Sequence, residues 1–345
     1  MSKEFRRRNH YIPRFYLDHW AQDGNICVYN TLVSCEVDVF RLKNPRGIAC
    51  IEHLYTDLQM LQETDEFERW ISSEIEEPYI RTQNRIFAEK RLNSDDYENL
   101  LRYAMAQSLR VPHYYFARFL PLAPRLENVV QKTGEKVIAS FERRIKFGQP
   151  LPESKKLTID GDSPTLKSAT FSDGDQAHVS VKGLLGRKEW LFQIKRIVSM
   201  APTKKQLHRW QIIRSLNGDS WFTSDNPVTL LNYQSNQNYN FNGGWGQKNT
   251  NIFMPISPQY LLFTQVGSKK IIENNKSFQN LINKMIIENS FLQVYSTAPN
   301  TDIPEIRPRI VDEQEYKRIH NMLSSWHIMQ TEGEHAFFGN SNPDL

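Results

Sequence analysis

Apolar residues recur at helical spacing through most of the first half of the chain. The clearest run begins near Asp95 and keeps its apolar positions on one helical face as far as Leu109. Pro112 follows, and its ring clashes with the carbonyl four residues earlier, so the helix is expected to kink or end there. Further helices are predicted at residues 14–21, 66–77, 78–91 and 126–146, and a small hairpin at residues 25–30 and 34–41.

Short apolar runs between turn residues dominate the second half. Residues 209–215 and 220–224 flank Asn217-Gly218, a dipeptide favoured in two-residue turns. We therefore expect a tight hairpin with Trp210 and Trp221 in adjoining strands. Other strands are predicted at residues 228–231, 251–256, 260–265 and 291–296, and helices at residues 188–200, 278–287 and 312–329.

The two patterns together predict an α+β fold, with a mostly helical N-terminal half and an antiparallel sheet with flanking helices in the C-terminal half. Residues 1–148 are expected to form the helical half. Pro, Ser, Asp, Gly and Lys dominate residues 149–176, which predicts a linker or surface insertion. The α+β half is expected at residues 177–330 and a polar tail at residues 331–345. The two halves could pack as one body.

Composition narrows the cellular setting. No run of 18 apolar residues occurs, so no membrane-spanning helix is expected. The charged N-terminus is not followed by the apolar stretch of a secretory signal. Three cysteines without a Cys-x-x-Cys spacing argue against a disulfide framework or a structural zinc site. We expect a cytoplasmic protein without membrane contact.

The net charge is concentrated at the N-terminus. Residues 1–14 carry five basic side chains against Glu4 alone, which equals the net charge of +4 of the whole chain. Such a basic arm could contact phosphate groups, and nucleic acid is therefore a candidate partner. The alternative is a solvated, partly mobile terminus. The basic residues of this arm are Lys3, Arg6, Arg7, Arg8 and Arg14.

Several common catalytic motifs are absent from the sequence. It contains no phosphate-binding loop of the Gly-x-x-x-x-Gly-Lys-Ser/Thr type and no Gly-x-Gly-x-x-Gly. It also lacks Gly-x-Ser-x-Gly and His-Glu-x-x-His. These absences argue against ordinary NTPases, dinucleotide enzymes, α/β-hydrolases and zincin proteases.

Five short stretches of the sequence form a recognisable set: Asn9–Leu17, Glu52–Thr56, Gln107–Pro112, Phe222–Val228 and Pro255–Pro258. In this order and spacing they resemble the bacterial family DUF4238, a family of unknown function. The resemblance covers about residues 8–297, and the opening His-Tyr-x-Pro-x-Phe-Tyr-Leu is its most specific element. Such proteins often begin with two histidines, whereas this chain has Asn9 at the first position. The resemblance implies a bacterial setting and no particular reaction, substrate or cofactor.

The same stretches contain the candidate site residues. His10 could be a general base, a metal ligand or a phosphate contact, or could instead pack on the first helix. Gln107 and Arg110 lie three residues apart and share a helix face, which Tyr114 extends. An arginine beside Val111 and Pro112 is not expected to be exposed, so it needs a carboxylate, carbonyl or bound anion as its partner.

Asp225 is the partner that we expect for Arg110, directly or through a ligand. It follows a predicted strand and could act as a base or a metal ligand. The alternative is a turn in which the Asp225 carboxylate accepts local N–H groups. Ser224, Arg14 and Tyr11 are predicted to contact the substrate beside it.

Two classes of function remain open on the sequence alone. The first is a hydrolase or nuclease acting on phosphodiesters, with His10, Asp225 and Gln107 as its catalytic residues. The second is a non-catalytic module that binds nucleic acid or another ligand, in which aromatic residues at 233–250 stack on bases. A third hypothesis is an accessory subunit of a larger complex. The cofactor is unknown. A divalent metal could be held by glutamates that otherwise form a solvated helix face, namely Glu52, Glu68, Glu74 and Glu76.

Overall fold

The helices of the first half form close to their predicted positions in the computed structural model, which describes residues 6–59, 62–150, 166–173, 176–200 and 209–339. A capping box starts α4: the Asn93 side chain accepts from the backbone N–H of Asp96, whose carboxylate accepts from the N–H of Asn93. α4 ends at Leu109, before Pro112. The helices and helical turns of this half are α1 (Arg14–Leu17), η1 (Asp18–Trp20), η2 (Pro45–Gly47), α2 (Glu66–Ile71), η3 (Ser72–Glu76), α3 (Glu77–Phe87), α4 (Ser94–Leu109), α5 (Pro112–Tyr114), η4 (Tyr115–Phe119), η5 (Leu120–Leu122) and α6 (Ala123–Lys146).

A π-helical turn, η3, joins α2 to α3 immediately before Pro78. In an uninterrupted α-helix, residues eight apart point about 80° away from each other. A π turn accommodates an extra residue and removes much of that rotation. Glu68 belongs to α2, and Glu76 is the last residue of η3. The π turn therefore brings the two side chains toward one face of the α2–η3–α3 helix.

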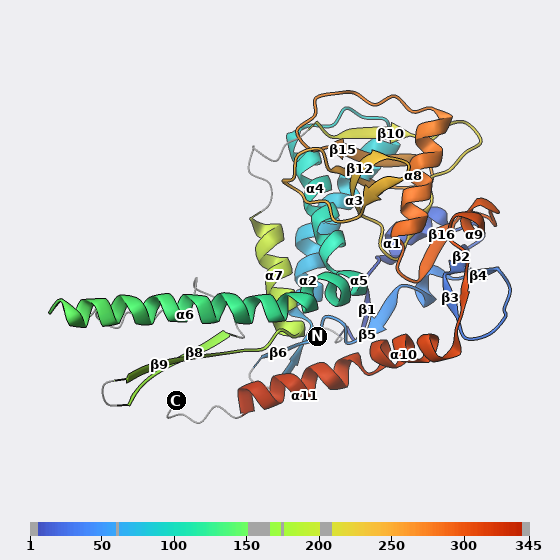
Figure 1. Ribbon diagram of the computed structural model, residues 1–345. Helices are drawn as coiled ribbons and strands as arrows, with labels where there is room; N and C mark the ends of the chain where they lie inside the picture. The colour runs from blue at the N-terminus through green and yellow to red at the C-terminus, as the bar shows by residue number, and fades with distance from the viewer. Residues whose placement is uncertain (1–5, 60–61, 151–165, 174–175, 201–208, 340–345) are drawn as a thin grey trace.

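Two antiparallel sheets form the rest of the body (Figure 1). The larger has the order β10-β15-β14-β12-β13, and α8 (Lys276–Asn289) packs against it. The smaller, β11-β16-β2-β4, pairs strands from both ends of the chain. The strands of the larger sheet are β10 (Gln211–Arg214), β12 (Thr229–Ser235), β13 (Asn238–Asn240), β14 (Asn251–Pro255) and β15 (Tyr260–Gln265). Those of the smaller are β2 (Ile26–Asn30), β4 (Phe40–Lys43), β11 (Thr223–Ser224) and β16 (Gln293–Ser296).

Short strand pairs complete the secondary structure. The N-terminal strand pairs antiparallel with β5, so that His10 lies opposite Cys50. The pairs are β1 (Arg8–His10) with β5 (Cys50–Glu52), β6 (Asp57–Gln59) with β7 (Gln62–Thr64), β8 (Leu166–Asp173) with β9 (Gln176–Gly183), and β3 (Leu32–Val33) with β17 (Ile310–Val311). The remaining helices are α7 (Arg187–Ser199), α9 (Asp302–Ile306), α10 (Glu313–Ser324) and α11 (Trp326–Gly339). Helices and antiparallel sheets together confirm the α+β class.

The predicted hairpin around Asn217-Gly218 is wrong. The turn itself forms, with Gly218 at φ +82° and the N–H of Asp219 donating to the carbonyl of Leu216. The strands on either side do not pair with each other: β10 pairs with β15, and β11 pairs with β16. Trp221 is buried in the core, and its backbone N–H donates to the carbonyl of Pro258. Packing against distant segments therefore overrides the local turn signal.

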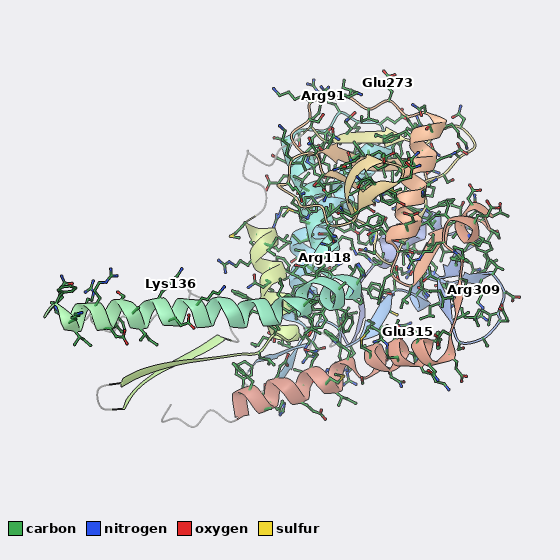
Figure 2. The ribbon with its side chains drawn as sticks, viewed as in Figure 1. Arg91, Arg118, Lys136, Glu273, Arg309 and Glu315 are labelled. Carbon is green, nitrogen blue, oxygen red and sulfur yellow. The ribbon has the colours of Figure 1, made fainter. Side chains whose placement is uncertain are left out.

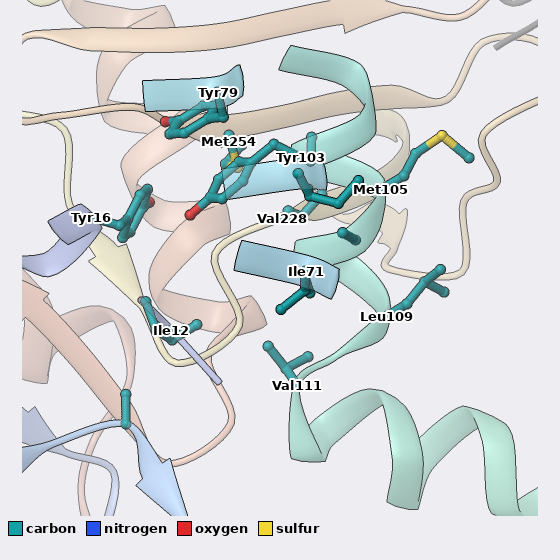
Figure 3. Packing of buried hydrophobic residues seen from close by; sticks show 14 of the residues in the cluster. Ile12, Tyr16, Ile71, Tyr79, Tyr103, Met105, Leu109, Val111, Val228 and Met254 are labelled. Atoms are coloured by element: carbon teal, nitrogen blue, oxygen red, sulfur yellow. The ribbon is translucent and has the colours of Figure 1, made fainter. Parts of the chain in front are cut away.

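The largest apolar cluster draws on both halves of the chain. Figure 3 shows Tyr16, Tyr79 and Tyr103 packed beside Met254 from β14. The rings of Tyr79 and Tyr103 stack with centroids 3.6 Å apart. The hydroxyl of Tyr16 donates to the carbonyl of Pro255 at 2.7 Å, which ties α1 to the larger sheet.

Some segments lie at the margin of this core. α6 extends from the body with β9 beside it (Figure 1). The expected linker at residues 149–176 lies mostly outside the described residues, and its part at 166–173 forms strand β8. The expected polar tail is helical as far as Gly339, the end of α11. Glu334 of this helix forms a fully buried ion pair with Arg187 at 2.7 Å, which ties the helix to α7. Across the described ranges, no helix is long and apolar enough to cross a membrane.

Candidate functional site

Arg110 is buried at the end of α4, as its sequence context predicts, with 1% of its surface exposed. Its Nη1 donates to the Glu76 carboxylate at 2.8 Å, and its Nε donates to Oε1 of Gln107 at 3.0 Å. The Arg110 carbonyl accepts from the Tyr55 hydroxyl at 2.8 Å. The expected direct pairing with Asp225 is therefore wrong, because Glu76 of the π turn supplies the carboxylate; a contact through a ligand stays a prediction.

Gln107 fixes both the guanidinium and the N-terminal segment. Its Oε1 accepts from Arg110, and its Nε2 donates to the Tyr11 carbonyl at 2.7 Å. The N-terminal segment is held further along by the Asn9 side chain, which accepts from the N–H of Tyr55 at 3.0 Å. His10 is consequently positioned from both sides, next to the end of α4.

Four polar atoms around Arg110 share an unusual property. They are buried, yet none has a hydrogen-bond partner in the part of the chain that the structure describes. Six other buried side-chain atoms of the described residues also lack a hydrogen-bond partner, but here three such atoms surround a cation that carries a fourth. Buried polar groups are nearly always hydrogen-bonded in folded proteins, so this grouping makes the surroundings of Arg110 the candidate functional site. The four are Nη2 of Arg110, Oε2 of Glu68, the hydroxyl oxygen of Tyr103 and Nε2 of His10.

The two carboxyl groups of this site have different environments. Burial raises the pKa of Glu68 to about 7, and the negative charge of Glu76 acts in the same direction, while Arg110 opposes them. Glu76 is paired with Arg110 and its side chain is 18% exposed. One carboxylate is thus held by a cation, and the other carries a proton for much of the time near neutral pH.

His10 is a neutral base in this environment. Burial lowers the pKa of His10, with smaller contributions in the same direction from Arg8 and Arg110, while a hydrogen bond to the Arg46 backbone carbonyl opposes them. Because Nε2 has no partner, that hydrogen bond uses Nδ1, which carries the proton. Nε2 therefore presents its lone pair and can accept a proton. We name Glu68, Glu76, Arg110, His10 and Tyr103 the Arg110 site.

Asp225 has a structural environment. Its carboxylate accepts from three backbone N–H groups, those of Phe291, Leu292 and Gln293, at 2.7–3.1 Å. Burial raises the pKa of Asp225 to about 6 although these N–H groups and Arg307 act in the opposite direction. The local turn that we considered does not supply these donors, because the N–H groups come from 66–68 residues further along the chain.

Replacing Asp225 by asparagine is expected to destabilise the protein by about 2 kcal/mol, because an amide N–H₂ would face N–H groups that lose their acceptor. The variant should keep the same pH dependence of any activity. Urea unfolding at constant pH measures the change, with Asp23→Asn at an exposed turn as the control. Unchanged stability together with lost activity would instead place Asp225 in the chemistry.

The other predicted contacts are dispersed. Ser224 is buried and its hydroxyl accepts from the N–H of Asn226. Arg14 is exposed and pairs with Asp18 at 3.4 Å. Burial raises the pKa of Tyr114, which is half-buried on α5. Tyr11 is tied to Gln107 through its carbonyl, and burial raises the pKa of its phenol.

The sequence suggested Glu68 and Glu76 only as possible ligands of a divalent metal. Within the described ranges, one group of three side chains has its ligand atoms within 4.8 Å of one another: His53, Glu63 and His327. Nδ1 of His327 lies 3.0 Å from Nη1 of Arg187, which can only donate, so the ring proton sits on Nε2, 2.9 Å from Glu63. This contact pattern is a hydrogen-bond chain that holds α11.

The residues of the Arg110 site all lie within the region that one family model matches. The model of the family described as "Protein of unknown function (DUF4238)" matches residues 8–299, as the resemblance in the sequence implied. No curated protein and no solved structure matches the chain. α10 and α11 follow the matched region. Because the match covers most of its length, this chain belongs to the DUF4238 family.

Proposed function

We propose that this protein is a hydrolase that cleaves phosphodiesters at the Arg110 site. The observation that supports the proposal most is the contrast between its two carboxyl groups: Glu76 is held by Arg110, and the pKa of Glu68 is about 7. Pairs of carboxyl groups whose environments separate their protonation are typical of acid–base sites.

Each group then has a defined task. Nη2 of Arg110 binds a non-bridging phosphate oxygen, since a guanidinium matches that geometry. Nε2 of His10 accepts a proton from the attacking water, which forms the new P–O bond. Glu68 gives its proton to the leaving oxygen as the old P–O bond breaks. The Tyr103 hydroxyl donates a hydrogen bond to the phosphate.

The approach to the site is basic. Arg6, Arg7 and Arg8 are exposed, and Arg6 and Arg8 act electrostatically on Glu68 and His10 respectively. Glu68, Glu76 and His10 are the partly exposed members of the site, so substrate would enter from their side. A polyanion such as nucleic acid fits this arrangement better than a neutral substrate.

Turnover tests the proposal directly. We expect the purified chain to hydrolyse bis(p-nitrophenyl) phosphate or oligonucleotides. The oligonucleotides to be tested are single- and double-stranded, of DNA and of RNA. Each assay is run separately with EDTA, Mg²⁺ and Mn²⁺. Activity should follow a bell-shaped pH profile because one group must be protonated and another not. Binding of oligonucleotides without cleavage in every condition would favour the non-catalytic module, for which the exposed arm is the supporting observation.

The arm makes a separate prediction. Changing Arg6, Arg7 and Arg8 together to alanine is expected to weaken oligonucleotide binding and to reduce the slope of log K against log salt by about three. Fluorescence anisotropy over a salt series measures that slope. The control is a triple change of exposed basic residues on α6: Lys136, Arg143 and Lys146. An unchanged slope would reduce the arm to a solvated terminus.

A further inference from the structure

A cavity lies between the smaller sheet and α10, and its lining includes no residue of the Arg110 site. The cavity encloses about 250 Å³, and its walls come from β2, β3, β4, the residues before and at the start of β16, and α10. The floor is apolar. Its apolar side chains are Leu32, Val33, Val37, Leu292, Ile319 and Leu323.

One wall of this cavity is positively charged. Arg41 and Lys43 lie two residues apart on β4 and therefore project from the same face of that edge strand. Neither forms an ion pair with a carboxylate anywhere in the described ranges, and no lining residue is acidic. The nearby Glu36 is paired with Arg309 at 3.1 Å, so it does not neutralise the wall (Arg309 is labelled in Figure 2).

The polar groups opposite the cations are largely engaged. Oδ1 of Asn30 accepts from Nε2 of Gln293, and Oε1 of Gln293 accepts from the Tyr295 hydroxyl. The rings of Tyr316 and His320 on α10 lie nearly parallel, with centroids 6.0 Å apart. The lining therefore carries two positive charges without a carboxylate partner, those of Arg41 and Lys43.

We propose that this cavity binds a small organic anion, a carboxylate or phosphate joined to an apolar body. The anionic group lies between Arg41 and Lys43, and the body packs on Val33, Ile319 and Leu323. Pockets for drug-sized molecules usually enclose roughly 300–1,000 Å³, so this one suits a smaller ligand. An apolar enclosure with a few placed charges is the common design of such sites.

Calorimetric titration of the full chain tests this site with five probes. Hexanoate and phenyl phosphate carry both features; hexanol lacks the charge; acetate and inorganic phosphate lack the apolar body. We expect binding of hexanoate, phenyl phosphate or both, and much weaker binding of the rest. Preference between the two amphipathic anions identifies the head group as carboxylate or phosphate.

Variants locate the binding. Arg41→Gln and Lys43→Gln should each weaken the preferred probe roughly tenfold, as expected for one lost charged contact. Ile319→Trp should block binding by filling the cavity. Lys136→Gln on α6, which Figure 2 shows far from Glu315 of α10, should leave the affinity unchanged. Absence of binding by both amphipathic anions at millimolar concentration would overturn the proposal, and so would binding that all three cavity variants leave intact.

Discussion

Replacing Arg110 by methionine is expected to destabilise the protein by about 3 kcal/mol. The substitution keeps most of the buried volume but leaves the Glu76 carboxylate without its cation, beside the carboxyl of Glu68. It also removes the donor to Gln107. Losses of 3–5 kcal/mol are typical when one partner of a buried pair is removed, and the partial exposure of Glu76 places this case near the lower end.

Urea unfolding provides the measurement, and a double substitution provides its control. Arg110→Met combined with Glu76→Met should recover most of the loss, because no uncompensated charge remains. Arg110→Lys should retain part of the stability through its charge but lose the contact with Gln107. A single Arg110→Met variant within about 0.5 kcal/mol of the parent, the range of ordinary surface changes, would show that the pair is not important for the fold.

Replacing Glu68 by glutamine is expected to lower phosphodiesterase turnover by about 10²–10⁴-fold, the usual contribution of a positioned acid. The same change should stabilise the protein at alkaline pH. The folded-state pKa of Glu68, about 7, lies above its ordinary value of 4.5. Folded protein therefore retains a proton that unfolded protein has released, and stability falls as pH rises from 4.5 through 7, by about 1–3 kcal/mol in total.

Loss of activity with gain of stability separates a catalytic acid from a structural one. Unfolding at pH 5 and pH 8 should show a smaller pH dependence for Glu68→Gln than for the parent. Glu74→Gln, at an exposed position of the same π turn, is the matched control and should change neither property. A Glu68→Gln variant that is less stable at pH 8 and fully active would contradict both halves of this prediction.

The parts of the fold that were predicted correctly depend on neighbouring residues. α4 begins at a capping box and ends before Pro112, and both signals lie within a few residues of the helix ends. The burial of Arg110 follows from the same local context. The Asn217-Gly218 hairpin failed because its flanking strands find partners in two different sheets.

The parts of the site that were missed depend on distant segments. The N–H groups that bind Asp225 come from residues 291–293, so no local pattern reveals them. The choice of Glu76 as the partner of Arg110 depends on the π turn, which alters the faces that a regular helix would present. Glu68 and Glu76, which both precede Pro78, were visible in the sequence, but regular helical spacing does not bring them together.

Carbon-13 NMR titration of the glutamate carboxyl groups tests the central claim most directly. The account predicts one glutamate carboxyl that titrates with a pKa of about 7, disappears in Glu68→Gln, and titrates at lower pH in Glu76→Gln because a neighbouring negative charge is removed. Arg110→Lys should leave that resonance near neutrality. If every glutamate carboxyl of the folded protein instead titrates near the ordinary value of about 4.3, Glu68 is not a proton donor at neutral pH and the Arg110 site does not work as described.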